Sequence, residues 1–496
     1  MEIRIVRESP GPRRAVYLQI ADQIRDAVSH GDLAQGERLP PIRSLAAELG
    51  VNRDTVSLAY ELLVRDGLLE ATVGRGTFVR LGQGSPTAGA SPAPPFAPLV
   101  ERLLQLERAR PSYNAVDGAV PLHALTPDPS LYPIDSFRMS LNRVLEESGS
   151  NLLAYGEHQG SIELRKTIAR RLSAQDFDID AENVVLCQGA SQGISLAMRL
   201  FAEPGDWVAV EEPTYHNVLA ALVGLGLRPA PIPMSEQGPD LEILERTLAR
   251  PEVKLFYTMP SFHNPLGRTT PESHRRSLIE VATRVGKPVI EDGFEMDLRY
   301  AGAQVSPLAA FDSQGIVVHL FSFSKSLFPG VRIGAVTARG RAVDGLLALK
   351  NASDLSGAMI LQAAVADFVN NGEYERHLAR LRGTLLERRN AMVEALEAAM
   401  PENARWTRPD GGYQLWLELP AEIDTSSLFD EAKRAGVLFA PGYQFHHDGR
   451  PSSAMRLTTA LADSAEIRRG IDILGDVVTR HLPHARHTAR DTNIHV

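Results

Sequence analysis

The stretch that decides the fold runs from residue 322 to residue 334 and reads Ser322-Phe-Ser-Lys-Ser-Leu-Phe-Pro-Gly-Val-Arg-Ile-Gly334. The preceding residues 316–321 form an apolar run, which is typical of a buried strand in a parallel sheet. Lys325 follows at the carboxyl end of that strand, in a polar loop. A lysine in this position suits amine chemistry, because partial desolvation lowers its pKa and leaves a neutral nucleophile.

Hydroxyl and guanidinium groups flank this lysine in the sequence. Ser322, Ser324 and Arg332 offer hydroxyl donors and a planar bidentate cation, the groups that a phosphate dianion binds. A lysine beside a phosphate-binding set predicts an imine to pyridoxal 5′-phosphate (PLP). The alternative is an ordinary solvated lysine in a surface loop, and this stretch alone leaves both interpretations open.

Composition narrows the class of protein. The chain has 496 residues, 44% of them hydrophobic and 23% charged, which predicts a globular protein of more than one domain. The net charge of -9 gives no global sign of nucleic-acid binding. One cysteine excludes an intramolecular disulfide, and neither a signal peptide nor an apolar run of membrane length is present. We therefore expect a cytoplasmic protein with no membrane partner.

Residues 1–80 read as a small domain of helices followed by a hairpin. Apolar residues recur at helical spacing over 17–28, a second short helix follows 39–41, and a third begins after Asn52, a plausible N-cap. Two apolar segments, 68–73 and 77–79, flank the glycine-rich tip 74–76. This order predicts a winged helix-turn-helix of α+β class. The alternative is a helical protein-interaction module.

Polar side chains gather where this domain would read DNA. The third helix begins with residues that can reach base edges and phosphates, the second helix carries a cation, and the hairpin tip carries another. Equal numbers of arginine and acidic residues make residues 1–80 formally neutral, so affinity must come from arginines clustered on one face. The predicted DNA-contacting residues are Arg43, Asn52, Arg53, Asp54, Thr55, Ser57 and Arg75.

The domain resembles the GntR-type winged helix-turn-helix, and the resemblance spans nearly all of residues 12–79. It rests on the segments 36–40, 43–46, 49–53, 55–56, 59–60 and 74–79. Pro41-Ile42 and Asp54 depart from the usual pattern. An acid in the reading turn repels phosphate or accepts from a cytosine amine, so the operator sequence stays open.

Residues 81–120 are predicted to be a linker. The segment 82–98 is rich in Gly, Ser, Ala and Pro and carries no charge, so it cannot bury a core and reads as a flexible tether. Leucines at 99, 103, 104 and 106 predict a short helix where the chain re-enters structure. At the other end, the polar segment 481–496 is expected to be a disordered tail.

Residues 121–480 alternate between strand-like and helical segments, which predicts a large α/β domain with a mainly parallel sheet. We also expect a smaller C-terminal α+β subdomain. Such sheets bind ligands at the carboxyl ends of their strands. The predicted strands are 184–187, 207–211, 254–258, 288–291 and 316–321.

Each strand end carries a group with a role in PLP chemistry. Ala190 and Ser191 open a helix whose N–H groups suit a phosphate, and Tyr215 offers a ring to stack on a heterocycle. Asn264 offers an amide to the phenolic oxygen, and Asp292 a carboxylate to the pyridine nitrogen. Separately, Asn264 could be a turn residue, Asp292 a helix cap and Tyr215 a half-buried ring; their order along successive strands favours PLP.

Residues 120–475 resemble the fold-type I PLP enzymes of the aspartate aminotransferase class. The resemblance rests on the segments 155–165, 189–192, 212–215, 264–267, 322–325 and 455–458. It implies that Lys325 holds PLP as an internal aldimine and that Arg456 binds a substrate carboxylate. It also implies that Tyr155 reaches the cofactor phosphate of a neighbouring subunit, hence a head-to-tail homodimer. Phe294 stands where a tyrosine hydroxyl is common, which puts the imine pKa in doubt.

The whole chain resembles the MocR/GabR-type transcriptional regulators. This implies a PLP-dependent regulator of operator DNA, bound to the nucleoid when on DNA, whose effector is a small amino compound with a carboxylate. The effector forms an external aldimine and alters operator binding. An active aminotransferase carrying a DNA-binding domain and a cofactor-free regulator remain alternatives, and turnover stays open. Cys187 and the histidines at 446 and 447 are read as structural, with no metal site expected.

Overall fold

The computed structural model describes residues 16–30, 33–34, 36–65, 67–72, 76–79, 96–113 and 118–482. These fall into two compact units, one within residues 1–95 and the other within 96–496. Within the described ranges, no helix is both long and apolar enough to cross a membrane. Arg75 at the predicted hairpin tip, most of the predicted tether and nearly all of the tail lie outside the described residues.

The first unit is a winged helix-turn-helix, as predicted. Its elements are α1 (Val16–His30), α2 (Ile42–Leu49), α3 (Arg53–Arg65) and the antiparallel strands β1 (Leu69–Thr72) and β2 (Gly76–Val79). Ile20, Leu45 and Val56, one from each helix, meet in its core. α2 ends at Gly50, which takes the left-handed conformation, and Asn52 Oδ1 accepts a hydrogen bond from the Asp54 N–H at 3.3 Å. A tight turn and a cap therefore set the start of α3.

The second unit is built on a seven-stranded sheet of order β4-β10-β9-β8-β7-β5-β6. Only β10 runs antiparallel to its neighbours. All five predicted strands are present, but two further strands were not predicted. β6 carries three prolines, which only an edge strand tolerates, and β10 is four residues long. The strands are β4 (Val184–Cys187), β5 (Trp207–Glu212), β6 (Arg228–Pro233), β7 (Val253–Thr258), β8 (Val289–Asp292), β9 (Val317–Ser322) and β10 (Gly334–Thr337).

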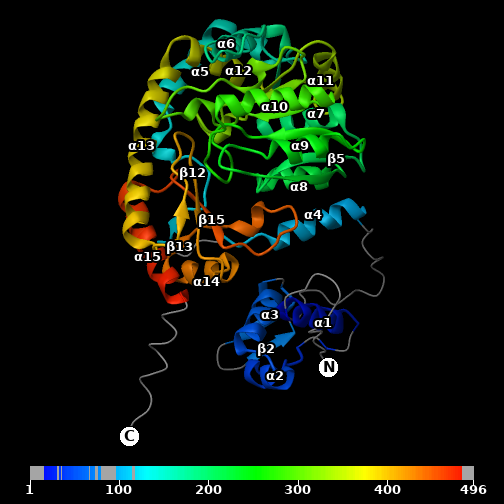
Figure 1. Cartoon of the computed structure of the whole chain (residues 1–496), viewed down its shortest axis with the longest axis vertical. Helices are drawn as coiled ribbons and strands as arrows, with labels where there is room; N and C mark the ends of the chain where they lie inside the picture. Colours follow the sequence, from blue (N-terminus) through cyan, green and yellow to red (C-terminus); the bar gives the residue numbers. More distant parts are fainter. Residues whose placement is uncertain are drawn as a thin grey trace. The chain divides into compact units, whose positions relative to one another are not determined.

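Helices cover both faces of this sheet (Figure 1). One face packs against α6 (Ile162–Ser173), α9 (Leu241–Leu248), α10 (Glu272–Val285) and α12 (Met359–Asn370). The other packs against α7 (Ala190–Phe201), α8 (His216–Gly224) and α11 (Arg341–Asn351). α5 (Ile134–Ser148) lies on α12, and α4 (Pro98–Ala109) lies on α8. Two apolar layers therefore hold the sheet rigidly, with its strand ends free to carry polar groups.

A smaller α+β subdomain completes the second unit. The long helix α13 (Glu373–Ala399) runs along its side to α15 (Ser464–His481) in Figure 1. Beside these two helices, which pack against each other, lie an antiparallel sheet of order β11-β12-β15-β14 and helix α14 (Thr425–Ala435). Its strands are β11 (Arg405–Trp406), β12 (Gln414–Glu418), β14 (Ala440–Pro441) and β15 (Ala454–Thr458). A parallel pair, β3 (Val120–Pro121) with β13 (Val437–Leu438), ties the start of the unit to this subdomain.

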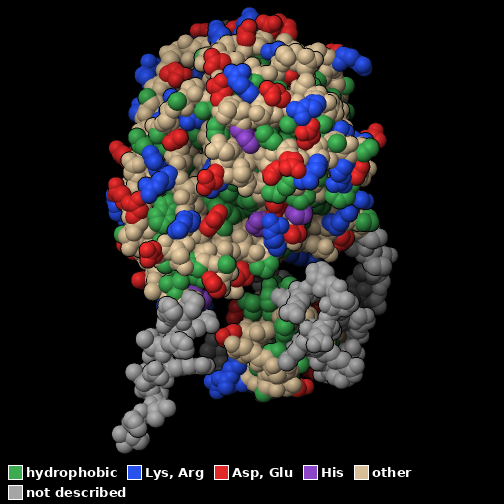
Figure 2. Space-filling view, in the orientation of Figure 1, with side chains coloured by type: hydrophobic (Ala, Val, Ile, Leu, Met, Phe, Trp, Pro, Cys, Tyr) green, Lys and Arg blue, Asp and Glu red, His purple; other side chains and the backbone are tan. Residues whose placement is uncertain are grey.

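Charges are mixed on the visible face of the second unit. Figure 2 shows basic and acidic side chains interspersed over it, without a broad patch of one sign. This face therefore offers no electrostatic footprint for a nucleic-acid backbone.

Candidate functional site

Lys325 lies in the loop that follows β9, as the sequence predicts. Its Nζ donates to the backbone oxygen of Leu125 at 2.6 Å, and its own backbone oxygen accepts from the Tyr413 hydroxyl at 2.7 Å. Burial lowers the pKa of the Lys325 ammonium, the Glu295 carboxylate opposes that shift, and Arg456 adds to it. The amine is thus held at both ends and is easier to deprotonate than a solvated lysine.

Asp292 ends β8 and is 1% exposed. The Tyr257 hydroxyl donates to its Oδ2 at 2.6 Å, while Oδ1 is buried without a partner among the described residues. Burial raises the pKa of Asp292 to about 6. An unpaired buried carboxylate oxygen is costly unless a cation or N–H donor reaches it, so this position fits a protonated ring nitrogen. Sequence reasoning missed Tyr257, although it belongs to the neighbouring strand β7.

Asn264 and Arg456 meet across the two subdomains. Arg456 Nη1 donates to Asn264 Oδ1 at 3.0 Å, and Nη2 donates to the backbone oxygen of His123 at 2.8 Å. Asn264 Nδ2 and Arg456 Nε, both buried, have no partner among the described residues. Burial lowers the pKa of Arg456 to about 10. This contact orients the amide so that its N–H donors remain free, and leaves a buried cation that makes no hydrogen bond to a carboxylate among the described residues.

Tyr215 and Phe294 present parallel rings. Their planes lie within 4° of each other, and their centroids are 6.5 Å apart. The Asn217 amide donates to the Tyr215 hydroxyl at 2.8 Å, which fixes that ring. Phe294 therefore contributes an aromatic face, at the position where its lack of a tyrosine hydroxyl was noted in the sequence.

Three of the predicted phosphate-binding residues, Ala190, Ser191 and Arg332, lie at the N-terminus of α7. The helix starts at Ala190, so Ala190 and Ser191 supply N–H groups of its first turn. Arg332 Nη2 donates to the backbone oxygen of Gln188 at 2.9 Å. Gly189 has a φ of +80°, and a Cβ there would lie 2.7 Å from Arg332 Nη2, so only glycine admits the guanidinium.

Two serines of the loop after β9 behave differently. Ser322 Oγ accepts from the Ser324 N–H at 3.2 Å, whereas Ser324 Oγ is buried and unpartnered within the described part of the chain. A buried hydroxyl without a partner in this loop can donate to an oxyanion.

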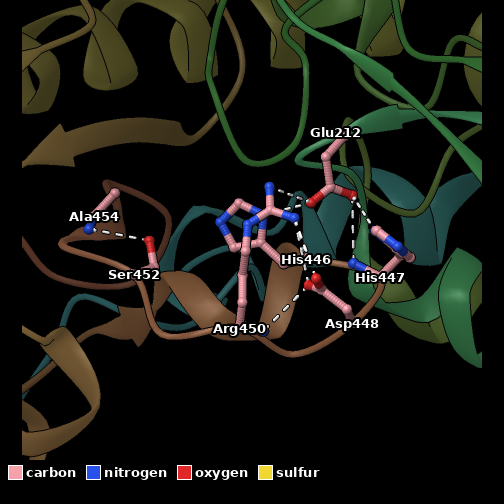
Figure 3. A network of polar contacts seen from close by, with 7 residues as sticks. All are labelled: Glu212, His446, His447, Asp448, Arg450, Ser452 and Ala454. Carbon is pink, nitrogen blue, oxygen red and sulfur yellow. Dashed lines mark hydrogen bonds and ion pairs between the residues drawn. The ribbon is translucent and has the colours of Figure 1, made fainter. Parts of the chain in front are cut away.

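A polar network links the Tyr215 loop to the smaller subdomain (Figure 3). Glu212, at the end of β5, accepts hydrogen bonds from His446 and His447, and Arg450 Nη2 lies 2.9 Å from its Oε1. Burial alone would raise the pKa of Glu212, but the two histidines outweigh it and leave it lowered. The sequence singled out these two histidines but did not indicate that Glu212 pairs with them. We call Glu212, His446, His447 and Arg450 the Glu212 clamp.

The clamp also brings Asp448 close to Glu212. Ligand atoms of Glu212, His447 and Asp448 lie within 4.8 Å of one another, as a metal site requires. However, Arg450 pairs with both carboxylates, at 2.9 Å from Glu212 and 3.4 Å from Asp448. Arg450 thus already pairs with both acids, and the arrangement is an ion-pair network that joins the two subdomains.

The remaining predicted residues lie at the surface. Tyr155 is 84% exposed. In the first unit, Arg43 on α2 and Asn52, Arg53 and Asp54 at the start of α3 are exposed, whereas Thr55 and Ser57 are half-buried. Ser57 Oγ donates to Glu61 Oε1 at 2.9 Å. The first turn of α3 therefore presents an amide, a cation and an acid together, as a recognition helix does.

Each of the two units matches a known protein family. Residues 128–474 match the aminotransferase class I and II family, and residues 16–79 match the gntR family of bacterial regulatory proteins. The chain belongs to the class I and II aminotransferase family and carries a GntR DNA-binding region, the combination of the MocR-type regulators.

Full-length relatives share this two-part organisation. The uncharacterized HTH-type transcriptional regulator YdcR of Escherichia coli (strain K12) is 32% identical over 94% of this chain and 99% of its own length. The probable rhizopine catabolism regulatory protein MocR of Rhizobium meliloti is 28% identical over 92% of this chain and 93% of its own length.

A solved structure shows the same α/β fold. LysN, the alpha-aminoadipate aminotransferase of Thermus thermophilus complexed with N-(5'-phosphopyridoxyl)-L-leucine, superposes with a TM-score of 0.69 and 30% identity. The match covers 78% of this chain and 95% of LysN. The cofactor of the second unit is pyridoxal 5′-phosphate.

The residues present fit that cofactor. The unpaired atoms of Asp292, Asn264 and Ser324 are complementary to a protonated ring nitrogen, a phenolic oxygen and a phosphate. When bound, PLP supplies an electrophilic carbonyl carbon and an electron-withdrawing ring. In such a complex Lys325 would supply the amine, Asp292 would keep the ring protonated and Tyr215 would offer a face on which the ring can stack.

Proposed function

We propose that this protein is a transcription regulator that senses an amino compound through PLP. The amino group of the effector displaces Lys325 from the cofactor, and the second unit then alters how the first binds operator DNA. The observation that carries this proposal is the set of unpaired buried polar atoms on Asp292, Asn264, Ser324 and Arg456, in a chain that also carries a GntR reader.

Arg456 indicates that the effector carries a carboxylate. The residue is 4% exposed, and among the described residues its guanidinium donates to an amide and a backbone oxygen rather than to a carboxylate. It lies over the Phe445 ring, 5.1 Å from the centroid, and its Nε is unpartnered among the described groups. A buried cation of this kind is most stable when a ligand anion pairs with it in bidentate geometry.

The regulator acts as a head-to-tail homodimer. Tyr155, whose ring is 84% exposed in the single chain, would reach the cofactor phosphate of the other subunit. A twofold assembly presents two readers to two operator half-sites. Its proposed contacts are Arg43, Asn52, Arg53, Asp54, Thr55, Ser57 and Arg75, the last predicted from the sequence alone. It acts in the cytoplasm and lies on the nucleoid while bound to DNA.

Ligand binding must favour one arrangement of the dimer. An effector with equal affinity for the DNA-binding and DNA-free arrangements would shift nothing. The experiment is a screen of amino acids and amines for a spectral change of the bound cofactor, followed by measurement of operator affinity with each hit. A hit that changes both supports the proposal. Hits that change the spectrum but leave operator affinity constant at saturation contradict it.

Arg456→Lys tests the carboxylate. Lysine keeps the charge but loses the bidentate fork, so the affinity for an effector with a carboxylate should fall about 10- to 100-fold. Amines without a carboxylate should bind both forms equally. Equal loss for both ligand classes would contradict recognition of a carboxylate by Arg456.

An active aminotransferase is the second candidate, favoured by the similarity to LysN and by the presence of Lys325, Asp292 and Arg456 in one site. Repeated turnover of an amino acid with a 2-oxo acid acceptor would establish it. A single spectral change without turnover, accompanied by altered operator affinity, supports the sensor.

A further inference from the structure

We propose that a second cavity of the larger unit binds a small molecule with two or more negative charges, carried by phosphate or by two carboxylates. The cavity has a volume of about 1030 Å³ and is bounded by α6, the short 3-10 helix η4 (Met296–Leu298) and α13. None of the residues predicted to hold PLP or the effector lines it. The site is therefore additional to the one on which the proposed function rests.

The charged residues that line this cavity carry a net positive charge. Four of them are arginines and two are acids, so a ligand with two negative charges would neutralise the set. The arginines are Arg170, Arg171, Arg299 and Arg382, and the acids are Asp297 and Glu375.

Asp297 gathers the arginines of two helices at one point. Its side chain is 3% exposed, and its Oδ1 accepts from Arg171 Nη2 at 2.9 Å and from Gln175 Nε2 at 3.3 Å. Its backbone oxygen accepts from Arg382 Nε at 2.8 Å. Arg171 of α6 and Arg382 of α13 thus meet on a single residue, although they lie more than two hundred positions apart in the chain.

The arginines of the cavity are not saturated by its acids. Arg171 pairs with both Asp297 and Glu375. Across the described ranges, Arg170, Arg299 and Arg382 form no ion pair, and the two terminal nitrogens of Arg382 make no hydrogen bond. A planar guanidinium with free terminal N–H groups donates in bidentate geometry to phosphate or carboxylate oxygens, so these cations suit an anionic ligand.

The same aspartate links the cavity to the loop that carries Lys325. The Tyr374 hydroxyl is buried and hydrogen-bonded to both Asp297 Oδ2, at 2.8 Å, and Ser326 Oγ, at 2.6 Å. Ser326 directly follows Lys325 in the chain. The Arg171 guanidinium lies over the Tyr374 ring, 4.4 Å from its centroid. We expect an anion that competes with Asp297 for Arg171 to alter the hydrogen bonds of Tyr374 and hence the surroundings of Lys325.

The experiment is a calorimetric titration of the full chain loaded with PLP, so that the phosphate-binding part of the cofactor site is filled. The probes are pyrophosphate, malonate and, as a monoanion, acetate. Pyrophosphate or malonate should bind with a Kd of about 1 mM or lower, and acetate should give no measurable binding. The tighter of the two distinguishes a phosphate ligand from a dicarboxylate. If neither binds, the proposal is wrong.

Arg382→Gln locates the bound anion. The variant loses the free terminal nitrogens of the guanidinium, so the Kd should rise about tenfold. Arg380→Gln is the matched control, because it removes an exposed arginine of α13 that does not line the cavity. An unchanged Kd in Arg382→Gln, or an equal rise in both variants, overturns the proposal. Should Arg382→Gln fail to fold, Arg170→Gln, at an exposed position, must show the rise instead.

A second measurement tests the link to Lys325. Addition of the binding probe should change the absorbance band of bound PLP at about 420 nm in the wild type. Tyr374→Phe keeps the ring but loses the bridging hydroxyl, so it should bind the probe and leave the band constant. A constant band in the wild type would overturn the link.

Failure of this site and failure of the proposed function give different results. A chain that takes up no PLP would refute the proposed function. The Kd values of the wild type, Arg382→Gln and Arg380→Gln, measured on the apoprotein, would then still decide whether the cavity binds the anion.

Discussion

The reader and the cofactor pocket place their functional side chains in opposite environments. In the first unit, Arg43 and Arg53 point into solvent from α2 and α3. In the second, Asp292, Glu295 and Arg456 are nearly inaccessible and keep unpaired polar atoms. DNA must therefore come to an open surface and gain affinity from salt-sensitive contacts, whereas the pocket is left incomplete without its ligand.

The difference predicts how each region responds to substitution. Exposed groups can be removed with little effect on folding, so the loss falls on DNA binding alone. Buried groups carry folding and ligand binding together, so both must be measured.

Lys325→Ala should give the largest effect. The variant cannot form a bond to the cofactor, so the absorbance band at about 420 nm should vanish after addition of PLP. Lys166→Ala, on an exposed face of α6, is the control and should keep the full band. A band of normal height in Lys325→Ala would show that another amine holds the cofactor.

Arg53→Ala should abolish the operator shift at moderate salt and leave the cofactor band unchanged. Removal of one phosphate- or base-contacting cation costs about 1–3 kcal/mol and, for a phosphate contact, lowers the salt slope by about 1. Arg468→Ala removes an exposed arginine of α15 and should bind DNA normally. Unaltered DNA affinity in Arg53→Ala would refute the placement of the recognition helix.

Asp292→Asn should weaken PLP binding but stabilise the apoprotein at alkaline pH. The pKa of Asp292 is raised from 3.8 to about 6, so ionisation of the buried group costs up to about 3 kcal/mol above pH 6. That cost disappears as the pH falls below about 4. Urea unfolding of apoprotein at pH 8 and pH 4.5 checks the sign. If the gain in the free energy of unfolding of Asp292→Asn were as large at pH 4.5 as at pH 8, the raised pKa of Asp292 would be contradicted.

Glu212→Gln should give the smallest effect, a destabilisation of about 1–3 kcal/mol at pH 7. The histidines lower the pKa of Glu212, so its contribution is present above the ordinary pKa of 4.5 and is lost as the pH falls through the lowered value. Urea unfolding at pH 7 and in acid measures this, with Glu422→Gln, an exposed glutamate, as control. If the free energy of unfolding of Glu212→Gln stayed below that of the wild type in strong acid, an electrostatic role of the Glu212 clamp would be excluded.

Local patterns in the sequence were enough to predict most of the fold. Continuous apolar runs gave the strands that lead to Asp292 and Lys325, and Asn52 and Gly50 marked the start of α3. β6 was missed because its prolines oppose the usual strand composition, and only its edge position makes them acceptable.

The candidate site was only partly predictable. Motif spacing pointed to Lys325 and Asp292, but contacts between distant segments left no local pattern. Glu295 was passed over because its burial depends on Gln414, which lies far along the chain. The Glu212 clamp joins residues more than two hundred positions apart. The sequence around Glu212 therefore does not predict its histidine partners, and the sequence around the histidines does not predict Glu212.

The path of the chain between β3 and Arg456 has a mechanical consequence. Residues that follow the tether enter the second unit at α4, pair with the smaller subdomain through Val120, and place the His123 carbonyl directly on Arg456. A ligand that moves the Arg456 guanidinium must therefore either move the segment that begins with β3 or break its hydrogen bond to the His123 carbonyl.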